Sequence, residues 1–235
     1  MVNRVLFIAV AAVFLMIEPV RADIVWTLPG SANQNQNLGT MKAFTSQSGG
    51  YNLTAYGYEV SPANSSTSTT LTLTTTTDLY GKSSGTGETG VGIYGTTDNE
   101  IGVHHAVALD LSSSYLNANG DVTITIGSVQ KNEGFAVFGG TLPGGSFPSS
   151  PYKLTDYIGQ VVNNTSSSTV QYTFTVTPSE MEAAHDVLYV SAVSGNVVIE
   201  SVSIASVPEP GTITMLLTGL ASVTGLGWYR RRKAS

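Results

Sequence analysis

Residues 121–127 read DVTITIG, and this stretch decides the fold class of the chain. Val122, Ile124 and Ile126 alternate with Thr123 and Thr125, which is the period-two pattern of a strand that buries one face. Threonine is β-branched and favours extended backbone, so the polar face supports the same conformation. An Asn-Gly pair at 119–120 precedes the stretch and is a turn signal. The sequence therefore predicts a half-buried β-strand that begins at a tight turn.

Similar short apolar runs recur along the chain, about ten of them, separated by turns rich in glycine, proline and asparagine. In two of these runs, Leu53 and Ala55, and likewise Leu71 and Leu73, are expected to face the core. Further strands are predicted at residues 23–28, 51–58, the second half of 65–77 with 79–82 closing that same strand, 91–95, 107–112, 134–139, 169–177, 187–192 and 197–204. This pattern predicts an all-β fold, a single two-sheet antiparallel sandwich.

Four details of the sandwich follow from local signals. Residues 31–37 are rich in Asn and Gln and predict a polar loop. Thr177-Pro178-Ser179-Glu180 has the spacing of a capping box with proline at the first helical position, which predicts a short helix ending near Ala184. The last two strands are expected to pair as a hairpin across residues 194–196. The first and last strands are expected to lie near each other.

The first 22 residues predict an export signal. Arg4 supplies a positive charge, and the apolar run 5–17 has the length of the hydrophobic region of a signal peptide. Val20 and Ala22 have the small or apolar character of a cleavage site, so we expect cleavage between Ala22 and Asp23, with the Sec machinery and signal peptidase as partners. An uncleaved N-terminal anchor is the alternative.

The C-terminal residues 207–235 predict a sorting or anchoring tail. Pro208-Glu209-Pro210 is followed by an uncharged segment, 211–229, and then by Arg230-Arg231-Arg232-Lys233. As a helix, the uncharged segment would span roughly 28 Å, close to the thickness of a bilayer's hydrocarbon core. The basic cluster is expected to stay in the cytoplasm and to leave the body outside. A permanent single-span anchor is the alternative to a processed signal.

These three parts of the tail, in this order, resemble the tail of PEP-CTERM proteins, which are exported bacterial proteins found mostly in species that make extracellular polysaccharide. The resemblance implies recognition by an exosortase, a membrane-embedded protease, with cleavage near Pro208-Glu209-Pro210. The body is similar to that of many PEP-CTERM proteins in the order of LYGK at 79–82, DNEI at 98–101 and LDLS at 109–112. That second resemblance implies a jelly-roll-like sandwich. Tails of this type are often labelled as belonging to ice-binding proteins, a label that says nothing about the body.

Three domains are therefore expected: the signal peptide 1–22, the sandwich 23–206 and the sorting tail 207–235. The chain has 10 basic and 16 acidic residues, of which six basic and two acidic ones lie outside 23–206, so the body keeps 4 against 14 and a net charge near −10. Such a body lacks the basic surface that nucleic acids require. The chain has no cysteine, so it has neither disulfides nor thiol chemistry.

Few residues are candidates for chemistry. Glu88, Asp98, Glu100 and Asp110 fall in one region and are the candidate ligands for a calcium ion, since calcium prefers oxygen ligands. Solvated loop acids are the alternative, and a pair of glycosidase carboxylates ranks behind both. His104 and His105 are adjacent, so in a strand they point to opposite faces and do not ligate one metal. The chain has no Gly-x-Ser-x-Gly motif.

Tyrosines offer a second candidate site, because flat rings stack on sugar faces. The candidates are Tyr51, Tyr56, Tyr58, Tyr152 and Tyr157. The alternative is that they are ordinary half-buried strand residues with a structural role. The threonine row of 65–77 would match a water lattice or a sugar, but one row is not a flat array, and a solvated strand face is the simpler interpretation.

Together these observations predict an exported, surface- or matrix-associated, non-catalytic protein with a structural or adhesive role in extracellular polysaccharide. A carbohydrate-binding module, with or without calcium, is the alternative. A glycoside hydrolase and an ice-binding protein rank behind it. No cofactor is expected, calcium being the one ion the carboxylates would suit. The expected location is a precursor tethered to the inner membrane and then the cell surface or the matrix.

Overall fold

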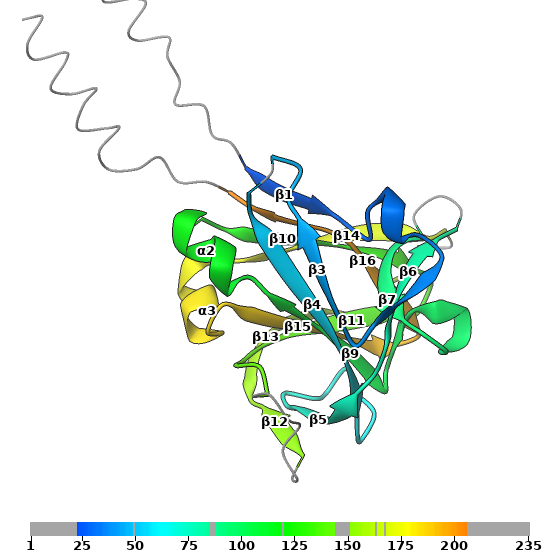
Figure 1. The fold of residues 1–235 in the computed structure, drawn as a ribbon. Helices are drawn as coiled ribbons and strands as arrows, with labels where there is room; N and C mark the ends of the chain where they lie inside the picture. Colours follow the sequence, from blue (N-terminus) through cyan, green and yellow to red (C-terminus); the bar gives the residue numbers. More distant parts are fainter. Residues whose placement is uncertain are drawn as a thin grey trace, which may run out of the picture. The chain divides into compact units, whose positions relative to one another are not determined.

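The stretch that alternates in the sequence forms β10 (Val122–Val129), which lies between β14 and β16 in the first of two antiparallel sheets (Figure 1). The computed structural model describes residues 23–48, 50–84, 88–118, 120–143, 151–162, 164–166 and 168–205. The predicted signal peptide, membrane-spanning segment, Pro-Glu-Pro motif and basic end lie outside the described residues. Within the described residues, Asp23–Ala205 is one compact unit.

Among the described residues, sheet A contains eight strands in the order β14-β10-β16-β7-β6-β2, with β1 and β8 also paired to β16. Its strands are β1 (Ile24–Thr27), β2 (Gln36–Gly39), β6 (Leu79–Ser83), β7 (Thr89–Ile93), β8 (Ile101–Gly102), β10, β14 (Val170–Val176) and β16 (Asn196–Ile204).

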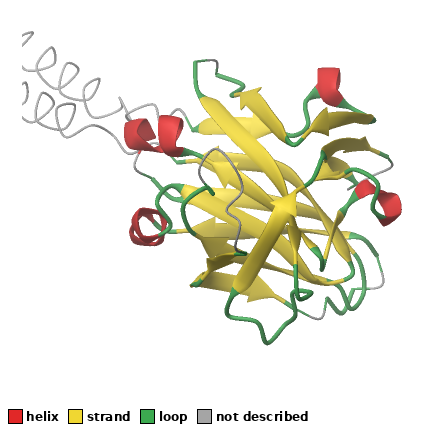
Figure 2. Ribbon diagram, turned by 60° about the horizontal axis from the view of Figure 1, so that its bottom comes forward, coloured by secondary structure: helices red, strands yellow, loops and turns green. Residues whose placement is uncertain are grey.

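Sheet B, in the part of the chain that the structure describes, also contains eight strands, in the order β12-β5-β4-β9-β15-β11-β13, with β3 paired to β4. Its strands are β3 (Met41–Thr45), β4 (Asn52–Val60), β5 (Leu71–Thr76), β9 (His105–Asp110), β11 (Gly134–Gly139), β12 (Tyr152–Leu154), β13 (Asp156–Val161) and β15 (Val187–Ser194). Figure 2 shows the short helices at the periphery of these strands. They are η1 (Ser31–Asn33), η2 (Thr97–Asn99), α2 (Ser112–Ala118) and α3 (Pro178–Ala183).

The main core lies between the two sheets and follows the predicted alternation. Leu53 and Ala55 of β4 are buried in this core, as are Ile124 and Ile126 of β10. A second cluster covers the opposite face of sheet B, where small alanines leave room for large rings. Its buried members are Tyr58, Val60, Leu71, Leu73, Ala106, Ala108, Ala136, Phe138, Leu154, Val187, Tyr189 and Val193. The central strands of sheet B are therefore buried on both faces.

The first and last strands of the body are neighbours, as the sequence predicts. β1 pairs with β16 so that Ile24 lies opposite Ile204. The two ends of the described body, Asp23 and Ala205, consequently leave from the same end of sheet A. The capping box is also confirmed: the Thr177 backbone N–H donates to Glu180 Oε2 at 2.7 Å, at the start of α3.

The predicted hairpin across residues 194–196 is wrong. β15 lies in sheet B between β9 and β11, whereas β16 lies in sheet A. Gly195, with φ +66°, carries the chain from one sheet to the other, and a Cβ there would lie 2.3 Å from Glu133 Cγ. β15 is buried almost throughout and β16 over about half of its length, and each lies inside its own sheet instead of pairing with its neighbour in sequence.

Several elements have weak sequence signals. The predicted loop at 31–37 contains η1 and the start of β2, an edge strand whose residues are all at least partly exposed. α2 forms in a serine-rich stretch where no helix is expected. β3, β12 and β13 are short or largely exposed, so they lack the clear apolar alternation of β10.

Candidate functional site

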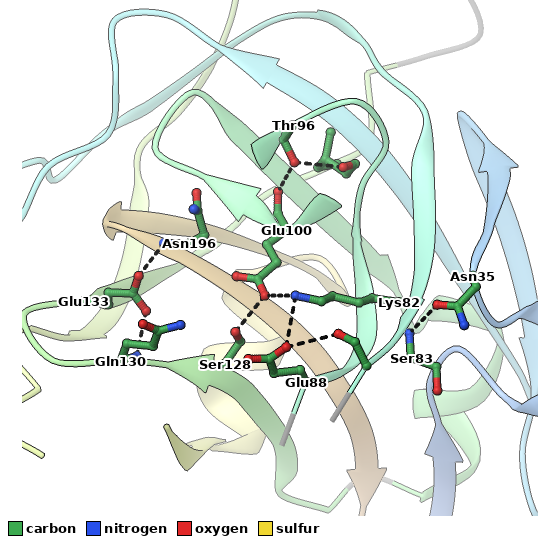
Figure 3. A network of polar contacts seen from close by, with 12 residues as sticks. Asn35, Lys82, Ser83, Glu88, Thr96, Glu100, Ser128, Gln130, Glu133 and Asn196 are labelled. Carbon is green, nitrogen blue, oxygen red and sulfur yellow. Dashed lines mark hydrogen bonds and ion pairs between the residues drawn. The ribbon is translucent and has the colours of Figure 1, made fainter. Parts of the chain in front are cut away.

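A buried ion pair lies at the centre of the most polar part of the body. Lys82, on β6, forms a salt bridge with Glu100, which directly precedes β8, and their side chains are only 9% and 6% exposed. Ser128 Oγ donates a hydrogen bond of 2.7 Å to Glu100 Oε1 (Figure 3). A buried charge is tolerated only when it is paired and hydrogen-bonded, and both conditions hold here.

Ser128 reaches Glu100 because β10 is irregular at this point. The pairing of β10 with β14 shifts register between Ile126 and Val129, and Ser128 has φ +59°. A bulge of this kind re-aims side chains. The bulge turns the Ser128 side chain towards the ion pair and thereby joins β10 to the β6–β7 region.

A second carboxylate completes the surroundings of Lys82. Glu88 Oε2 lies 3.5 Å from Lys82 Nζ and also accepts a hydrogen bond of 3.0 Å from Ser84 Oγ. The Glu88 side chain is 31% exposed, so it marks the side on which the ion pair meets solvent. The ammonium thus lies between a buried and a partly exposed carboxylate.

The turn that carries Glu100 is held by its own hydrogen bonds. Thr96 Oγ1 donates to the Glu100 carbonyl oxygen at 2.7 Å, and Asn99 Oδ1 accepts from Gly95 N–H at 3.0 Å. Asp98 and Asn99 both have positive φ, which asparagine and aspartate tolerate better than most residues. Gly92 is required beneath the turn, because a Cβ there would lie 2.1 Å from the Asn99 carbonyl oxygen.

Beside the ion pair is a pocket of about 390 Å³. Its lining residues are Asn35, Tyr80, Lys82, Ser84, Glu88, Asp98, Asn99, Glu100 and Gln130. Tyr80 stacks on Tyr94, with ring centroids 6.0 Å apart and an interplanar angle of 30°. Tyr94 is 51% exposed, so an accessible aromatic ring adjoins a pocket lined by amides and carboxylates.

Gln130 is positioned by Glu133. The Glu133 carboxylate accepts hydrogen bonds from the Gln130 backbone N–H at 2.6 Å and from the Asn196 backbone N–H at 3.3 Å (Figure 3). Burial raises the pKa of Glu133, while these two hydrogen bonds act in the opposite direction. The carboxylate fixes the turn between β10 and β11, and the Gln130 side chain extends into the pocket from that turn.

The four candidate calcium ligands are only partly brought together. Glu88, Asp98 and Glu100 line the pocket, but Asp110 ends β9 in sheet B, where its Oδ1 accepts hydrogen bonds from Ser112 N–H and Oγ. Among the described residues, no three His, Asp or Glu side chains are arranged to hold a metal ion. The expectation did not include Lys82, whose ammonium is paired with two of these carboxylates. Its place at the end of LYGK, in a strand that begins with the buried Leu79, is the signal that could have identified it.

Four of the five candidate tyrosines gather on the outer face of sheet B. Tyr58 is 3% exposed and packs on Tyr189 at 6.0 Å, and Tyr157 packs edge-on to Phe138 at 5.6 Å. Tyr56 and Tyr152 border the same cluster, whereas Tyr51 packs against the main core. Burial raises the pKa of Tyr58 to about 12. The rings are tilted against one another and form part of a core, so they do not present a flat platform.

The histidines do not converge. His104 Nδ1 lies 3.4 Å from the Val60 carbonyl oxygen, and His105 is the first residue of β9. Burial lowers the pKa of His105, which keeps it neutral at pH 7. His185 lies two residues after the end of α3. Nothing in this arrangement joins them to the pocket carboxylates.

The body is thus an all-β, acidic, cysteine-free unit of two antiparallel sheets, with a polar pocket next to a buried ion pair. Residues 206–233 match the PEP-CTERM protein-sorting motif, which confirms the predicted tail. The motif indicates an exported protein that is processed in the cell envelope by machinery of the exosortase type. No curated protein and no solved structure matches the chain. Within the described residues, the structure contains no helix with the length and apolar character needed to cross a bilayer.

Proposed function

We propose that this protein is an exported, surface- or matrix-associated, non-catalytic β-sandwich with a structural or adhesive role in extracellular polysaccharide. The observation that carries the proposal is the sorting motif at 206–233 directly after a compact β body. That body is acidic and has no cysteine, and it has few charged residues, so uncharged polar side chains provide most of its solubility. This composition suits an extracellular protein. Crossings between the sheets, such as β15 to β16, favour a jelly-roll-like arrangement.

The protein is proposed to be non-catalytic because of how its carboxylates are engaged. Hydrolysis of a glycoside needs two carboxyl groups that face the substrate. Glu100 is buried and paired with Lys82 and Ser128, and Glu88 is paired with Lys82 and Ser84, so among the described pocket carboxylates Asp98 alone is left without a partner and could meet a sugar. An ice-binding role ranks behind, because Thr72 and Thr74 are half-buried on a strand with neighbours on both sides.

A carbohydrate-binding module is the second candidate, and one observation favours it. The pocket is lined by amide and carboxylate side chains and by Tyr80, which stacks on the exposed Tyr94. Saccharides are bound by this combination, since their hydroxyls need planar hydrogen-bonding partners and their ring faces stack on aromatic rings. No cofactor is proposed for either candidate.

Sorting is tested in the native host with the full-length chain and a variant in which Pro208, Glu209 and Pro210 are all alanine. Cell fractionation and immunoblotting should find the wild-type protein, shortened at its C-terminus, at the surface or in the medium. The variant should accumulate at full tail length in the inner membrane. A matched control, Val207→Ala, should behave like the wild type. Wild-type localisation and processing of the triple variant would contradict the proposal.

A further inference from the structure

We propose that the pocket beside β6 binds an uncharged saccharide, one or two pyranose rings of the polysaccharide in which the protein resides. The inference rests on the proposed carbohydrate-associated role and names the site. The pocket's volume, about 390 Å³, falls within the roughly 300–1,000 Å³ typical of small-molecule sites. Such sites are usually apolar, whereas this one is lined almost entirely by polar side chains, which suits a ligand rich in hydroxyl groups.

The first argument is that hydrogen-bonding groups in the pocket are left over after the protein's own bonds are made. Asn35 and Asn99 each use their Oδ1 to accept a backbone N–H, from Ser83 and Gly95 respectively. Within the described part of the chain, the Nδ2 groups of both have no hydrogen-bond partner. The same is true of the Gln130 amide, the Asp98 carboxylate and the Tyr80 hydroxyl.

These leftover groups match the chemistry of sugar hydroxyls. Amides and carboxylates offer adjacent donors or acceptors in one plane, and vicinal hydroxyls present the complementary pair. Amide Nδ2 and Nε2 groups donate, while the Asp98 carboxylate only accepts. The pocket therefore offers both the donors and the acceptors that the hydroxyl groups of a pyranose need.

The second argument is the ring at the edge of the pocket. Tyr80 lines the pocket and stacks on Tyr94, which is the most exposed aromatic side chain among the described residues. An aromatic ring left in water next to a polar pocket gains from covering the apolar C–H face of a sugar. The rings on the outer face of sheet B are buried by packing, whereas the Tyr94 ring remains exposed.

The third argument is that the site is pre-organised. The wall of the pocket contains the buried pair Lys82 and Glu100, and the turn at 95–99 is held by Thr96 and Asn99. A ligand would therefore order few groups on binding, which lowers the entropic cost of binding.

Charge selects among ligand classes. Three carboxylates, Glu88, Asp98 and Glu100, face one ammonium, Lys82, so the pocket is negative and would repel uronate, sulfate or phosphate groups. A divalent cation is disfavoured because Lys82 lies between Glu88 and Glu100. An uncharged sugar meets neither obstacle.

The test is isothermal titration calorimetry on the full-length chain, in a detergent that has no sugar headgroup. The probes are neutral gluco-, galacto-, manno- and N-acetylglucosamine oligosaccharides, uronic acid oligosaccharides and Ca²⁺ alone. At least one neutral oligosaccharide should bind, and the uronic acid series should not. Gln130→Ala and Tyr94→Ala should each weaken binding about tenfold, the effect of losing one good contact.

Matched controls are Gln47→Ala and Tyr157→Ala, which remove the same side chains outside the pocket and should leave the affinity unchanged. Circular dichroism of every variant checks the fold. The proposal is overturned if no neutral oligosaccharide binds, if the pocket variants bind as tightly as the wild type, or if only Tyr157→Ala loses binding. A Ca²⁺ signal abolished by Asp98→Asn would assign the pocket to a cation and would also overturn it. Sorting by the tail is measured separately by fractionation, so these failures leave that proposal standing.

Discussion

The outer face of sheet B and the pocket beside β6 both concentrate side chains that often bind ligands, but they use them differently. On the outer face, Tyr58, Phe138 and Tyr189 pack on one another and on alanines, and they are almost fully buried. Beside the pocket, Tyr94 is exposed where it stacks on Tyr80, and pocket amides such as that of Gln130 have no partner within the described residues. The comparison teaches that availability, more than residue type, distinguishes a binding site from a core.

The largest expected effect separates the two regions by stability. Phe138→Ala should lower the free energy of unfolding by about 3–5 kcal/mol, because it empties a fully buried ring position. Tyr94→Ala should lower it by less than about 0.5 kcal/mol, the range of exposed substitutions. Urea denaturation of both variants checks the contrast. Equal losses would mean that the two regions are not distinct kinds of packing.

The buried ion pair should behave as the structural wall of the pocket. Lys82→Met should cost about 3 kcal/mol, since it leaves Glu100 buried without its counter-ion. The double variant Lys82→Met/Glu100→Leu should recover most of that loss, because it removes both charges. Thermal and urea unfolding measure both. A single variant as stable as the wild type would show that the pair is not an essential part of the wall.

Alkaline pH should weaken the outer face selectively. Burial raises the pKa of Tyr58 to about 12 in the folded protein, whereas unfolded tyrosine ionises near 10. The folded state therefore binds more protons between these values, so this contribution is fully present below about pH 10 and is lost as the pH rises towards 12. Tyr58→Phe should unfold with a shallower dependence on pH over this range. Identical pH profiles for variant and wild type would contradict this interpretation of the cluster.

The smallest expected effect concerns metal removal. If Lys82 takes the place of a cation among the pocket carboxylates, adding EDTA should change the Tm by less than about 1 °C. A calcium ion that bound only the folded state would instead stabilise it by mass action, and chelation would lower the Tm by several degrees. Differential scanning calorimetry with and without chelator makes the comparison.

Sequence reasoning was most reliable where a pattern is local and repeated. The strand at 121–127, the burial of Leu53 and Leu71, and the capping box at Thr177 each depend on a few neighbouring residues, and each is confirmed. The sorting tail was identified for a similar reason, since its three parts are adjacent in the chain and correspond to one motif.

Long-range arrangement was less accessible. The chain between β15 and β16 looks like a hairpin turn, yet it crosses between sheets: β15 is buried between β9 and β11 in sheet B, and β16 pairs with strands of sheet A that are distant in the sequence. The wall of the pocket depends on Lys82 of β6, Glu100 in the segment before β8 and Ser128 of β10, which are far apart in the sequence. A lysine in a buried strand was a signal, but the bulge that turns Ser128 inward has no pattern in the sequence.

Intact-mass spectrometry of the mature protein from its native host tests the central claim, export and C-terminal sorting of this body, most directly. The account predicts a polypeptide that begins at Asp23 and ends near Pro208-Glu209-Pro210, recovered from the cell surface or the medium. Recovery of the complete 235-residue chain from the cytosol would contradict it.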